Sequence, residues 1–367
     1  MKYCLIGCGR ISTNHIKAAL GNNLDIVGVC DIVAEKMEAV LADNSIGDDS
    51  SIHRYTDYKK MIEVEKPTLV SIATESGKHA EIALYCIEHG MNTIIEKPMA
   101  MNLHDADRII EAAERKGLVV SVCQQCRFNK SVQAVRKALE EGRFGVLSHA
   151  SINVYWNRNK GYYDHDSWRG TWKDDGGCLM NQCIHGCDLL RWMMGTDIDT
   201  VYGVTANRLH GYLETEDIGS AVVKFKNGTI GVVEGTGNVF KNNLEETLYI
   251  FGSNGRVKLG GNSANNIEVW DFADERKEDS LAKGLLEPAP NVYGHGHTRL
   301  FADVHDAIVQ GRMPYVTVYD GRTALELILA IYKSQKTGLP VKLPLEDFST
   351  EDMVGTFGAK EIPASDN

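Results

Sequence analysis

Short apolar runs alternate with amphipathic segments through the first third of the chain. The apolar runs predict strands at 3–6, 26–30, 68–72, 92–95 and 118–122. The amphipathic segments predict helices from residue 12 onward and at 33–42, 78–88 and 103–115. Strands that alternate with helices of this length form parallel sheets through right-handed crossovers. We therefore predict an α/β fold that begins with a doubly wound parallel sheet in a first domain spanning residues 1–122.

The pattern changes after a predicted helix at 129–141. Period-two alternation predicts strands at 147–155, 201–209, 218–225, 229–235, 246–251 and 257–259, with turns between several of them. This is typical of an antiparallel meander, so we predict a second α/β domain over 123–367 with a large, mainly antiparallel open sheet. A free apolar face of that sheet would suit an oligomer interface. Two late helices, at 298–310 and 321–337, either return to the first domain or cover the sheet, and the charged stretch 273–296 is a loop and a candidate lid.

The first strand leads into a glycine-containing turn, Gly7-Cys8-Gly9-Arg10-Ile11-Ser12, followed by a helix. In a dinucleotide-binding turn the first glycine allows the tight bend and the second allows a pyrophosphate to approach the helix N-terminus. Asp31 ends the second strand, at the offset where a carboxylate binds the adenosine ribose diol. Because an acid there repels a 2′-phosphate, we predict NAD rather than NADP as the cofactor. The predicted cofactor contacts are Gly7, Gly9, Arg10, Ile11, Asp31, Thr74, Ser76, His79, Glu96 and Lys97.

Some of these contacts have a second interpretation. Thr74 and Ser76 lie in a small polar turn, where each could bind phosphate or ribose or could cap the next helix. His79 begins that helix and is either a cofactor contact or a neighbour of the cap. Arg10 could simply be a solvated residue at a helix start.

The strand at 92–95 ends abruptly in Glu96, Lys97 and Pro98. In an open α/β sheet the ligand crevice lies beyond the carboxyl ends of the strands, so both charged side chains are expected at that crevice. The proline removes a backbone donor and turns the chain away from the sheet. A cis Lys97-Pro98 bond is compatible with this turn.

A glycine pair at 176–177 precedes a predicted helix with a polar stripe. Asn181, His185 and Asp188 are spaced i, i+4 and i+7, so a continuous helix would place them on one face. Such a stripe on an otherwise apolar helix is costly to bury and is typical of a site. Hydride transfer from a secondary alcohol needs a base for the hydroxyl proton and a cation for the developing alkoxide. We predict His185 as base, Lys97 as the polarising cation (or with the roles exchanged), and Asn181 as the group that orients the hydroxyl.

Composition narrows the classes of partner. The chain of 367 residues has a formal charge of −11, which argues against nucleic acid and anionic membranes and favours a small molecule. No apolar run approaches the length of a membrane span, and we expect a cytoplasmic protein. The nine cysteines are an odd number without a staple spacing and are expected to be reduced. Redox or zinc chemistry at Cys123 and Cys126, or around Cys178 to Cys187, is the less favoured alternative; the predicted reaction needs no metal.

With these motifs together and in order, the sequence resembles the Gfo/Idh/MocA family of oxidoreductases, along nearly its whole length. The resemblance implies a Rossmann domain followed by an α/β domain with a large open sheet, NAD(P) as hydride acceptor, and homodimers or homotetramers built through that sheet. The family's catalytic lysine maps to Lys97 and its helix histidine to His185. Inositol dehydrogenases of the family have an aspartate four residues before this histidine, whereas this chain has Asn181, which removes an anionic relay.

Aromatic residues and arginines at 155–172 are similar to a branch of the family that acts in sugar and nucleotide-sugar metabolism. Rings stack on sugars or bases, and guanidinium groups pair with phosphates or uronate carboxylates. The predicted substrate contacts are Lys97, Arg158, Tyr163, Arg169, Asn181 and His185. The alternative is that the tryptophans pack this loop and that one arginine alone binds substrate. His295 and His297, between glycines, could also close over the substrate.

We therefore predict an NAD-dependent dehydrogenase acting on a secondary ring hydroxyl of a sugar, cyclitol or nucleotide sugar. Two alternatives remain at this stage. One is a glycosidase that retains its NAD and uses transient oxidation. The other is a non-enzymatic regulator that senses the dinucleotide.

Overall fold

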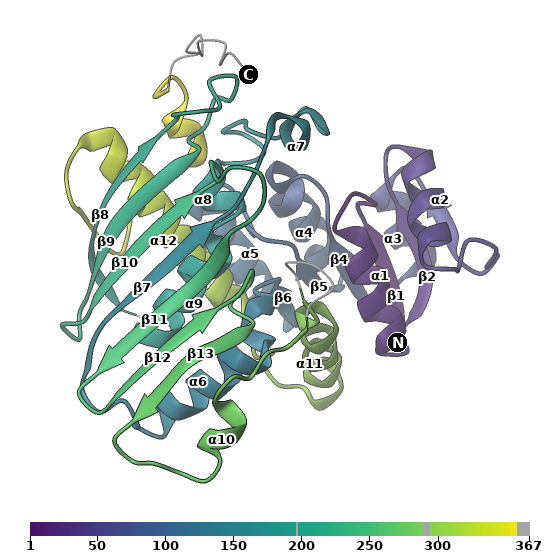
Figure 1. The fold of residues 1–367 in the computed structure, drawn as a ribbon. Helices are drawn as coiled ribbons and strands as arrows, with labels where there is room; N and C mark the ends of the chain where they lie inside the picture. Colours follow the sequence, from purple (N-terminus) through teal and green to yellow (C-terminus); the bar gives the residue numbers. More distant parts are fainter. Residues whose placement is uncertain (196, 289–293, 358–367) are drawn as a thin grey trace. The chain divides into compact units, whose positions relative to one another are not determined.

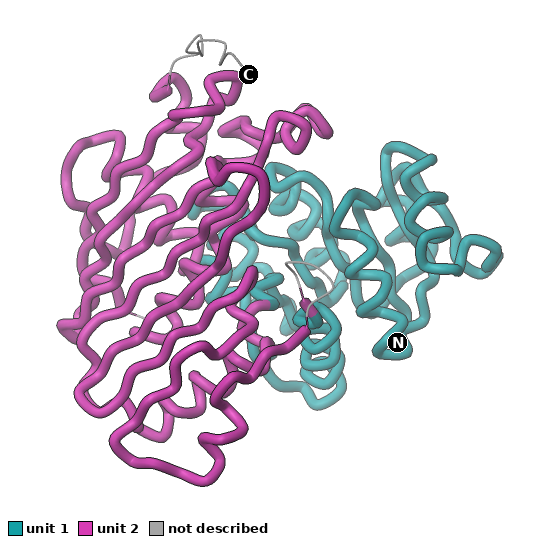
Figure 2. Tube along the Cα trace, in the orientation of Figure 1, with its two compact units in different colours: residues 1–125, 295–322 teal, residues 126–294, 323–367 magenta. Residues whose placement is uncertain are grey.

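The structure, a computed structural model, describes residues 1–195, 197–288 and 294–357. The chain divides into two compact units, drawn in different colours in Figure 2. Unit 1 comprises Met1–Gln125 and His295–Arg322, and unit 2 comprises Cys126–Gly294 and Thr323–Asn367. The sequence-based division lay at residue 122, and the returning segment 295–322 folds with the first unit.

Unit 1 is built on a parallel sheet of six strands in the order β3-β2-β1-β4-β5-β6 (Figure 1). Its strands are β1 (Lys2–Ile6), β2 (Asp25–Cys30), β3 (His53–Tyr55), β4 (Leu69–Ile72), β5 (Asn92–Ile95) and β6 (Val120–Val122). The chain runs outward from β1 to β3 and then returns to place β4 on the other side of β1. Crossovers between parallel strands are generally right-handed, so such a reversal sends helices to opposite faces of the sheet, and sheets of this topology bind ligands beyond the carboxyl ends of the strands at the reversal, which here are β1 and β4. The predicted doubly wound sheet is confirmed.

The helices of unit 1 form two groups. They are α1 (Ser12–Gly21), α2 (Ala34–Asp43), α3 (Tyr58–Glu65), η1 (Ser76–Lys78), α4 (His79–Glu88), α5 (Leu103–Lys116) and α11 (Gly296–Gln310). Helix α1 contacts α2 and α11, whereas α4 contacts α5 and meets α3 through the rings of Tyr58 and Tyr85. Of the two late helices, α11 thus packs on the dinucleotide-type helix α1. The short strand β3 and helix α3 were not predicted from the sequence.

Unit 2 contains a sheet of eight strands in the order β13-β12-β11-β7-β10-β9-β8-β14 (Figure 1). These are β7 (Leu147–Tyr155), β8 (Ile198–Ala206), β9 (Ile218–Phe225), β10 (Ile230–Thr236), β11 (Glu245–Gly252), β12 (Gly255–Gly260), β13 (Asn266–Phe272) and β14 (Val341–Lys342). The sheet is not the simple meander that was predicted. Strand β7 lies between β11 and β10, and its pairing with β10 is parallel. The remaining pairs are antiparallel, so the predicted class of a large, mainly antiparallel sheet is confirmed.

One face of this sheet is covered and the other is open. The helices of unit 2 are η2 (Gln125–Phe128, beginning at the unit boundary), α6 (Lys130–Glu140), α7 (Lys160–Asp164), α8 (Cys178–Asn181), α9 (Ile184–Met194), α10 (Asp279–Ala282), α12 (Val318–Thr337, beginning in unit 1) and η3 (Thr350–Met353). Helices α8 and α9 contact the central strands, and Ile331 of α12 lies against Gly203 of β8. On the opposite face Tyr202, Val222 and Val232 form one cross-strand row and stay exposed.

The sequence also led to predictions about membrane-spanning segments, the cysteines and the stretch 273–296. Among the described helices, none is long and apolar enough to cross a bilayer. All nine cysteines are buried and none is disulfide-bonded, and all nine lie within the described residues. The predicted loop at 273–296 contains the short helix α10, and its residues 289–293 lie outside the described part of the chain.

Candidate functional site

The turn after β1 has the backbone that a dinucleotide fingerprint requires. Gly7 has a φ of 93° and donates its N–H to Cys30 O at 2.8 Å. A Cβ on Gly7 would lie 2.5 Å from the carbonyl carbon of Ala73, at the start of the loop after β4. Only glycine therefore fits here, because both the left-handed backbone and the close approach exclude a side chain.

The next glycine faces open space. A Cβ on Gly9 would meet nothing within 4 Å, and the N-terminus of α1 has no side-chain cap. The first N–H groups of a helix are unpaired and carry partial positive charge, so an uncapped N-terminus beside an open glycine fits a pyrophosphate. Arg10 is exposed and Ile11 partly exposed on this turn.

Asp31 is fixed at the end of β2. Its Oδ2 accepts the N–H of Cys8 at 2.8 Å, and its Oδ1 accepts the N–H of Val33 at 2.9 Å. A carboxylate offers about four lone-pair positions, so two hydrogen bonds leave capacity for the two hydroxyls of a ribose. The residues of this edge of unit 1 therefore fit NAD.

The predicted cofactor contacts in the loop after β4 differ in how exposed they are. Thr74 is partly exposed and donates to Glu75 O at 3.2 Å, whereas Ser76 is buried. His79 is also buried, with Nδ1 2.7 Å from Pro98 O and Nε2 3.1 Å from Thr74 O. Burial lowers the pKa of His79, so the ring is neutral near pH 7. A neutral ring has a single N–H, so it can donate to only one of these two carbonyl oxygens, and the ring lies between the Thr74 loop and the segment after Lys97.

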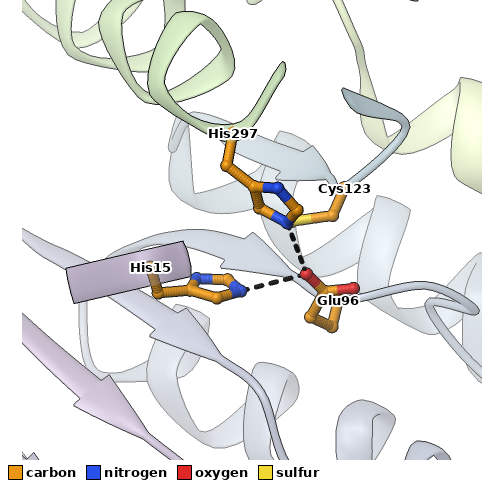
Figure 3. A group of neighbouring side chains, drawn as sticks. All are labelled: His15, Glu96, Cys123 and His297. Carbon is orange, nitrogen blue, oxygen red and sulfur yellow. Dashed lines mark hydrogen bonds and ion pairs between the residues drawn. The ribbon is translucent and has the colours of Figure 1, made fainter. Parts of the chain in front are cut away.

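The carboxylate of Glu96 is enclosed within unit 1. Its Oε1 lies 3.0 Å from Nε2 of both His15 and His297 (Figure 3). Its Oε2 accepts the N–H of Lys97 at 3.1 Å. His297 is therefore buried against Glu96 and is not a residue that closes over a substrate. The Lys97-Pro98 bond is cis. Sequence reasoning did not find this cluster, because 81 and 201 residues separate its hydrogen-bonded partners.

The predicted helix with a polar stripe is interrupted in unit 2. Helix α8 ends at Asn181 and α9 begins at Ile184, so Asn181 and His185 do not belong to one continuous helix. Asn181 hydrogen-bonds through Nδ2 to Asp175, whose other oxygen accepts the N–H of Gly170 at 2.7 Å. His185, in the first turn of α9, is 4% exposed. The break separates the amide from the imidazole by a kink that spacing alone could not reveal.

Asp188 does not line a site. Its two oxygens accept Nε and Nη2 of Arg127, each at 2.6 Å, and both side chains are at most 2% exposed. The guanidinium also lies 4.9 Å over the ring of Trp192. This bidentate pair fixes helix α9.

Two arginines of unit 2 flank one tyrosine. The guanidinium carbons of Arg158 and Arg169 lie 5.0 and 4.5 Å from the ring centre of Tyr162. The tyrosine hydroxyl accepts Nη1 of Arg169 at 2.7 Å and Nε2 of Gln182, next to Asn181, at 3.1 Å. The Nε of Arg158 is buried without a hydrogen-bond partner. The two cations thus lie beside the segment that carries Asn181, and one of them has a donor to spare.

Other residues of the aromatic segment pack. Trp172 is fully buried against Tyr332, as the packing alternative expected for the tryptophans. Tyr163 is 6% exposed and lies among the rings of His210 and Tyr212; burial raises the pKa of its hydroxyl. Tyr162, which the sequence analysis did not single out, occupies the position between the arginines.

A buried acid supports the glycine pair. Glu216 accepts the N–H of Leu179 at 2.7 Å and contacts the Tyr332 hydroxyl at 2.8 Å, and burial raises its pKa to about 8. A Cβ on Gly177 would lie 1.8 Å from its Oε2. Glycine is needed there so that the chain can pass over this carboxyl group at the start of α8.

Two family models match the chain. The model of the oxidoreductase family with an NAD-binding Rossmann fold matches residues 1–124, and the model of the GFO/IDH/MocA C-terminal domain matches residues 132–258. These matches cover unit 1 up to β6 and most of the sheet of unit 2.

Solved structures and curated proteins are similar along nearly the whole chain. The WlbA dehydrogenase from Bordetella pertussis, solved with NADH and UDP-GlcNAcA, is 32% identical, with a TM-score of 0.84 over 94% of this chain and 99% of its own. The WlbA dehydrogenase from Chromobacterium violaceum, in complex with the same two molecules, is 31% identical, with a TM-score of 0.85 over 94% of this chain and 96% of its own. Myo-inositol 2-dehydrogenase from Thermotoga maritima is 23% identical over 94% of this chain and 98% of its own length.

Proposed function

The chain belongs to the GFO/IDH/MocA family of oxidoreductases, and from this premise we propose that it uses NAD to oxidise a secondary ring hydroxyl of a nucleotide-activated sugar bearing an acidic group. The observation that carries the substrate class is the pair of guanidinium groups around Tyr162, beside the segment of Asn181. The two WlbA dehydrogenases above, each more than 30% identical, were solved with NADH and an acidic nucleotide sugar, which supports the same class.

The cofactor is held by unit 1. Gly7 allows the tight turn, and Gly9 leaves room for the pyrophosphate at the uncapped start of α1, whose N–H groups donate to it. The carboxylate of Asp31 accepts hydrogen bonds from the ribose hydroxyls. When bound, NAD supplies the hydride acceptor. The fixed carboxylate of Asp31 disfavours a 2′-phosphate, because the two negative charges would repel each other.

We assign the proton transfer to His185. A neutral imidazole accepts a proton from a hydroxyl near operating pH, and helix α9, which carries His185 in its first turn, is anchored by the pair between its Asp188 and Arg127 of η2. Asn181, held by Asp175, orients the hydroxyl toward the imidazole. Replacing a general base typically costs ~10²–10⁴-fold in rate, which sets the expected loss for His185→Ala.

Lys97 provides the positive charge. An ammonium stabilises the oxygen from which the proton departs, so its removal should lower kcat more than it weakens cofactor binding. The main chain at Lys97 is fixed by the hydrogen bond of its N–H to Glu96. Lys97→Ala is therefore expected to bind NAD and to turn over at least ~10²-fold more slowly.

The acidic group is recognised by Arg158 and Arg169. Planar guanidinium groups bind carboxylates and phosphates in a two-pronged manner, and both guanidinium groups lie over the ring of Tyr162. Arg169 is already held by Asp166 and Tyr162, which orients it before substrate arrives.

A matched pair of substrates tests the substrate class. We would follow reduced nicotinamide with UDP-GlcNAcA and with UDP-GlcNAc, which lacks the carboxylate, and include a free hexose and myo-inositol. The proposal predicts that the acid is preferred and that Arg158→Met and Arg169→Met reduce that preference. Arg256→Met, which removes an exposed arginine of the same unit, is the control and should leave the preference unchanged. Equal turnover of both nucleotide sugars by the wild type would contradict the assignment of an acidic substrate.

The open face of the unit 2 sheet supports a homo-oligomer. Tyr202, Val222 and Val232 lie side by side across three strands and are 38–49% exposed. An apolar row of this kind on a sheet suits another copy of the same face. Val222→Lys is expected to reduce the molar mass measured by light scattering, whereas Val64→Lys, at an exposed valine of α3, should not. A monomeric wild type would exclude this proposal.

A further inference from the structure

Four buried side chains from four separate segments of unit 1 converge on one point (Figure 3). They are His15 of α1, Glu96 after β5, Cys123 after β6 and His297 of α11. Their ligand-type atoms all lie within 4.8 Å of one another, and none of the four residues is more than 6% exposed. The catalytic chemistry proposed above uses none of them directly, although Glu96 immediately precedes Lys97.

Hydrogen bonding explains this cluster better than a metal ion does. Both imidazoles approach Oε1 of Glu96 with Nε2 at 3.0 Å, so both Nε2 atoms carry a hydrogen. A histidine that binds a metal through Nε2 carries its proton on Nδ1 and normally donates that proton to a partner. Nδ1 of His15 is buried without any partner, and an N–H there would be unsatisfied. With the proton on Nε2, the remaining Nδ1 is only an unused acceptor.

The cluster keeps a carboxylate ionised in the interior. Burial alone would raise the pKa of Glu96, but the hydrogen bonds from His15 and His297 outweigh it and hold this pKa well below its usual value. Burial lowers the pKa of His15, which is therefore neutral, and burial raises the pKa of Cys123, which keeps its thiol proton.

Two further titratable groups face Glu96 from outside the cluster. His79 of α4 is buried, and burial lowers its pKa, so it adds no positive charge near neutral pH. The other group is Lys97 itself, whose N–H is bonded to Glu96 Oε2. Of these two groups, Lys97 is the cation, and it is adjacent in sequence to the buried carboxylate of Glu96.

We propose that the His15–Glu96–His297 cluster is a positioning device for Lys97. It keeps Glu96 ionised, and Glu96 in turn fixes the main chain of Lys97 and supports its ammonium form. The inference rests on the proposed role of Lys97 in the proposed function and adds that the protonation of this lysine is set by a carboxylate that never meets the substrate. Because α1 supplies one of the two imidazoles, the same cluster links the helix of the dinucleotide turn to the catalytic lysine.

The test uses Glu96→Gln, which keeps the shape of the side chain and removes its charge. Competitive labelling of amines with acetic anhydride across a pH series, read at Lys97 by mass spectrometry, measures the pKa of this lysine without substrate. We expect that pKa to fall by about one unit or more in Glu96→Gln, since the negative charge on the residue next to the lysine is removed. The alkaline limb of kcat should move to lower pH by the same amount, with KM for NAD nearly unchanged.

A second pair of variants separates positioning from folding. His297→Gln keeps an amide donor that can reach Glu96, whereas His297→Leu removes the donor, so the glutamine variant is expected to recover most of the wild-type pH profile and the leucine variant is not. Unchanged Lys97 labelling and an unchanged pH profile in Glu96→Gln would overturn the proposal, even if that variant were less stable. Stoichiometric metal in the purified protein, whose removal reproduced the Glu96→Gln profile, would also overturn it. If instead the wild type reduced NAD with no compound, the proposed function would fail, while labelling of Lys97 would still decide the inference.

Discussion

Replacing Asp188 by asparagine should strongly destabilise unit 2. The carboxylate is bound by Arg127 through two hydrogen bonds of 2.6 Å, and both residues are almost fully buried. Asparagine keeps the shape and one acceptor but leaves a buried guanidinium without its counter-charge. Removing one partner of a buried pair typically costs about 3–5 kcal/mol, and because the retained amide and the Trp192 ring still contact Arg127, we expect the lower end, about 3 kcal/mol.

The distribution of tryptophans provides the assay. All of the chain's tryptophans lie in unit 2, at Trp156, Trp168, Trp172, Trp192 and Trp270. Urea unfolding followed by tryptophan fluorescence therefore reports the transition of that unit, whereas circular dichroism reports both. This distinction matters because a chain of two units need not unfold in a single step.

Two control variants show whether the loss in Asp188→Asn comes from the buried ion pair. Asp164→Asn removes the acid of the exposed Lys160–Asp164 pair and should change the free energy of unfolding by less than about 0.5 kcal/mol. The double variant Arg127→Met with Asp188→Leu removes both members of the hydrogen-bonded pair but leaves the buried Arg191, whose guanidinium lies 3.7 Å from Asp188, so it should recover part of the loss. If Asp188→Asn stayed within about 1 kcal/mol of the wild type, the argument that this ion pair holds α9 in place would be refuted.

Three other perturbations have outcomes set by the structure. Burial raises the pKa of Glu246 to about 8, whereas in the unfolded state this carboxyl group has its usual pKa of 4.5. The folded state therefore keeps a proton that the unfolded state releases, and stability should fall as pH rises between these two values. Glu246→Gln should reduce the difference between the melting temperatures measured at pH 6 and pH 8. Gly177→Ala places a Cβ 1.8 Å from an oxygen of Glu216. Gly228 has a similar φ, 89° against 94°, but a Cβ there meets nothing within 4 Å, so Gly228→Ala is the control for backbone strain alone. In urea unfolding, Gly177→Ala should lower the free energy of unfolding by at least about 2 kcal/mol and Gly228→Ala by about 1 kcal/mol. Asp31→Ala should weaken NAD binding at least about tenfold and narrow the preference over NADP, measured by titration calorimetry with both cofactors; equal NAD affinity in wild type and variant would contradict the role assigned to this carboxylate.

The residues predicted to bind NAD could be found from the sequence because their roles depend on the backbone and side chains close to them in the chain. A glycine that must adopt a positive φ and an acid that ends a strand act within a few residues of their own position, and Gly7 and Asp31 lie where that logic places them. The alternation of residues likewise predicted the bounds of β7 and β9 as the structure has them, because each strand buries one face under helices.

Tertiary contacts decided what the sequence pattern could not. The i, i+4, i+7 spacing assumed one helix, but the chain bends at Gln182 and Cys183, so Asn181 is bound to Asp175 while Asp188 is bound to Arg127. The partners of Glu96 come from helices far along the chain, and no local period marks them. Strand β7 is the first strand of the predicted meander along the chain, yet it is central in the sheet, since later strands pair on both of its sides.

The most direct measurement of the central claim is the initial rate of reduced-nicotinamide formation from NAD and UDP-GlcNAcA, for the wild type and for His185→Ala. The account predicts turnover by the wild type, a rate lower by ~10²–10⁴-fold in the variant, and similar NAD affinity in both. A wild-type protein that binds NAD but transfers no hydride from this or any nucleotide sugar, or a His185→Ala variant as active as the wild type, would contradict it.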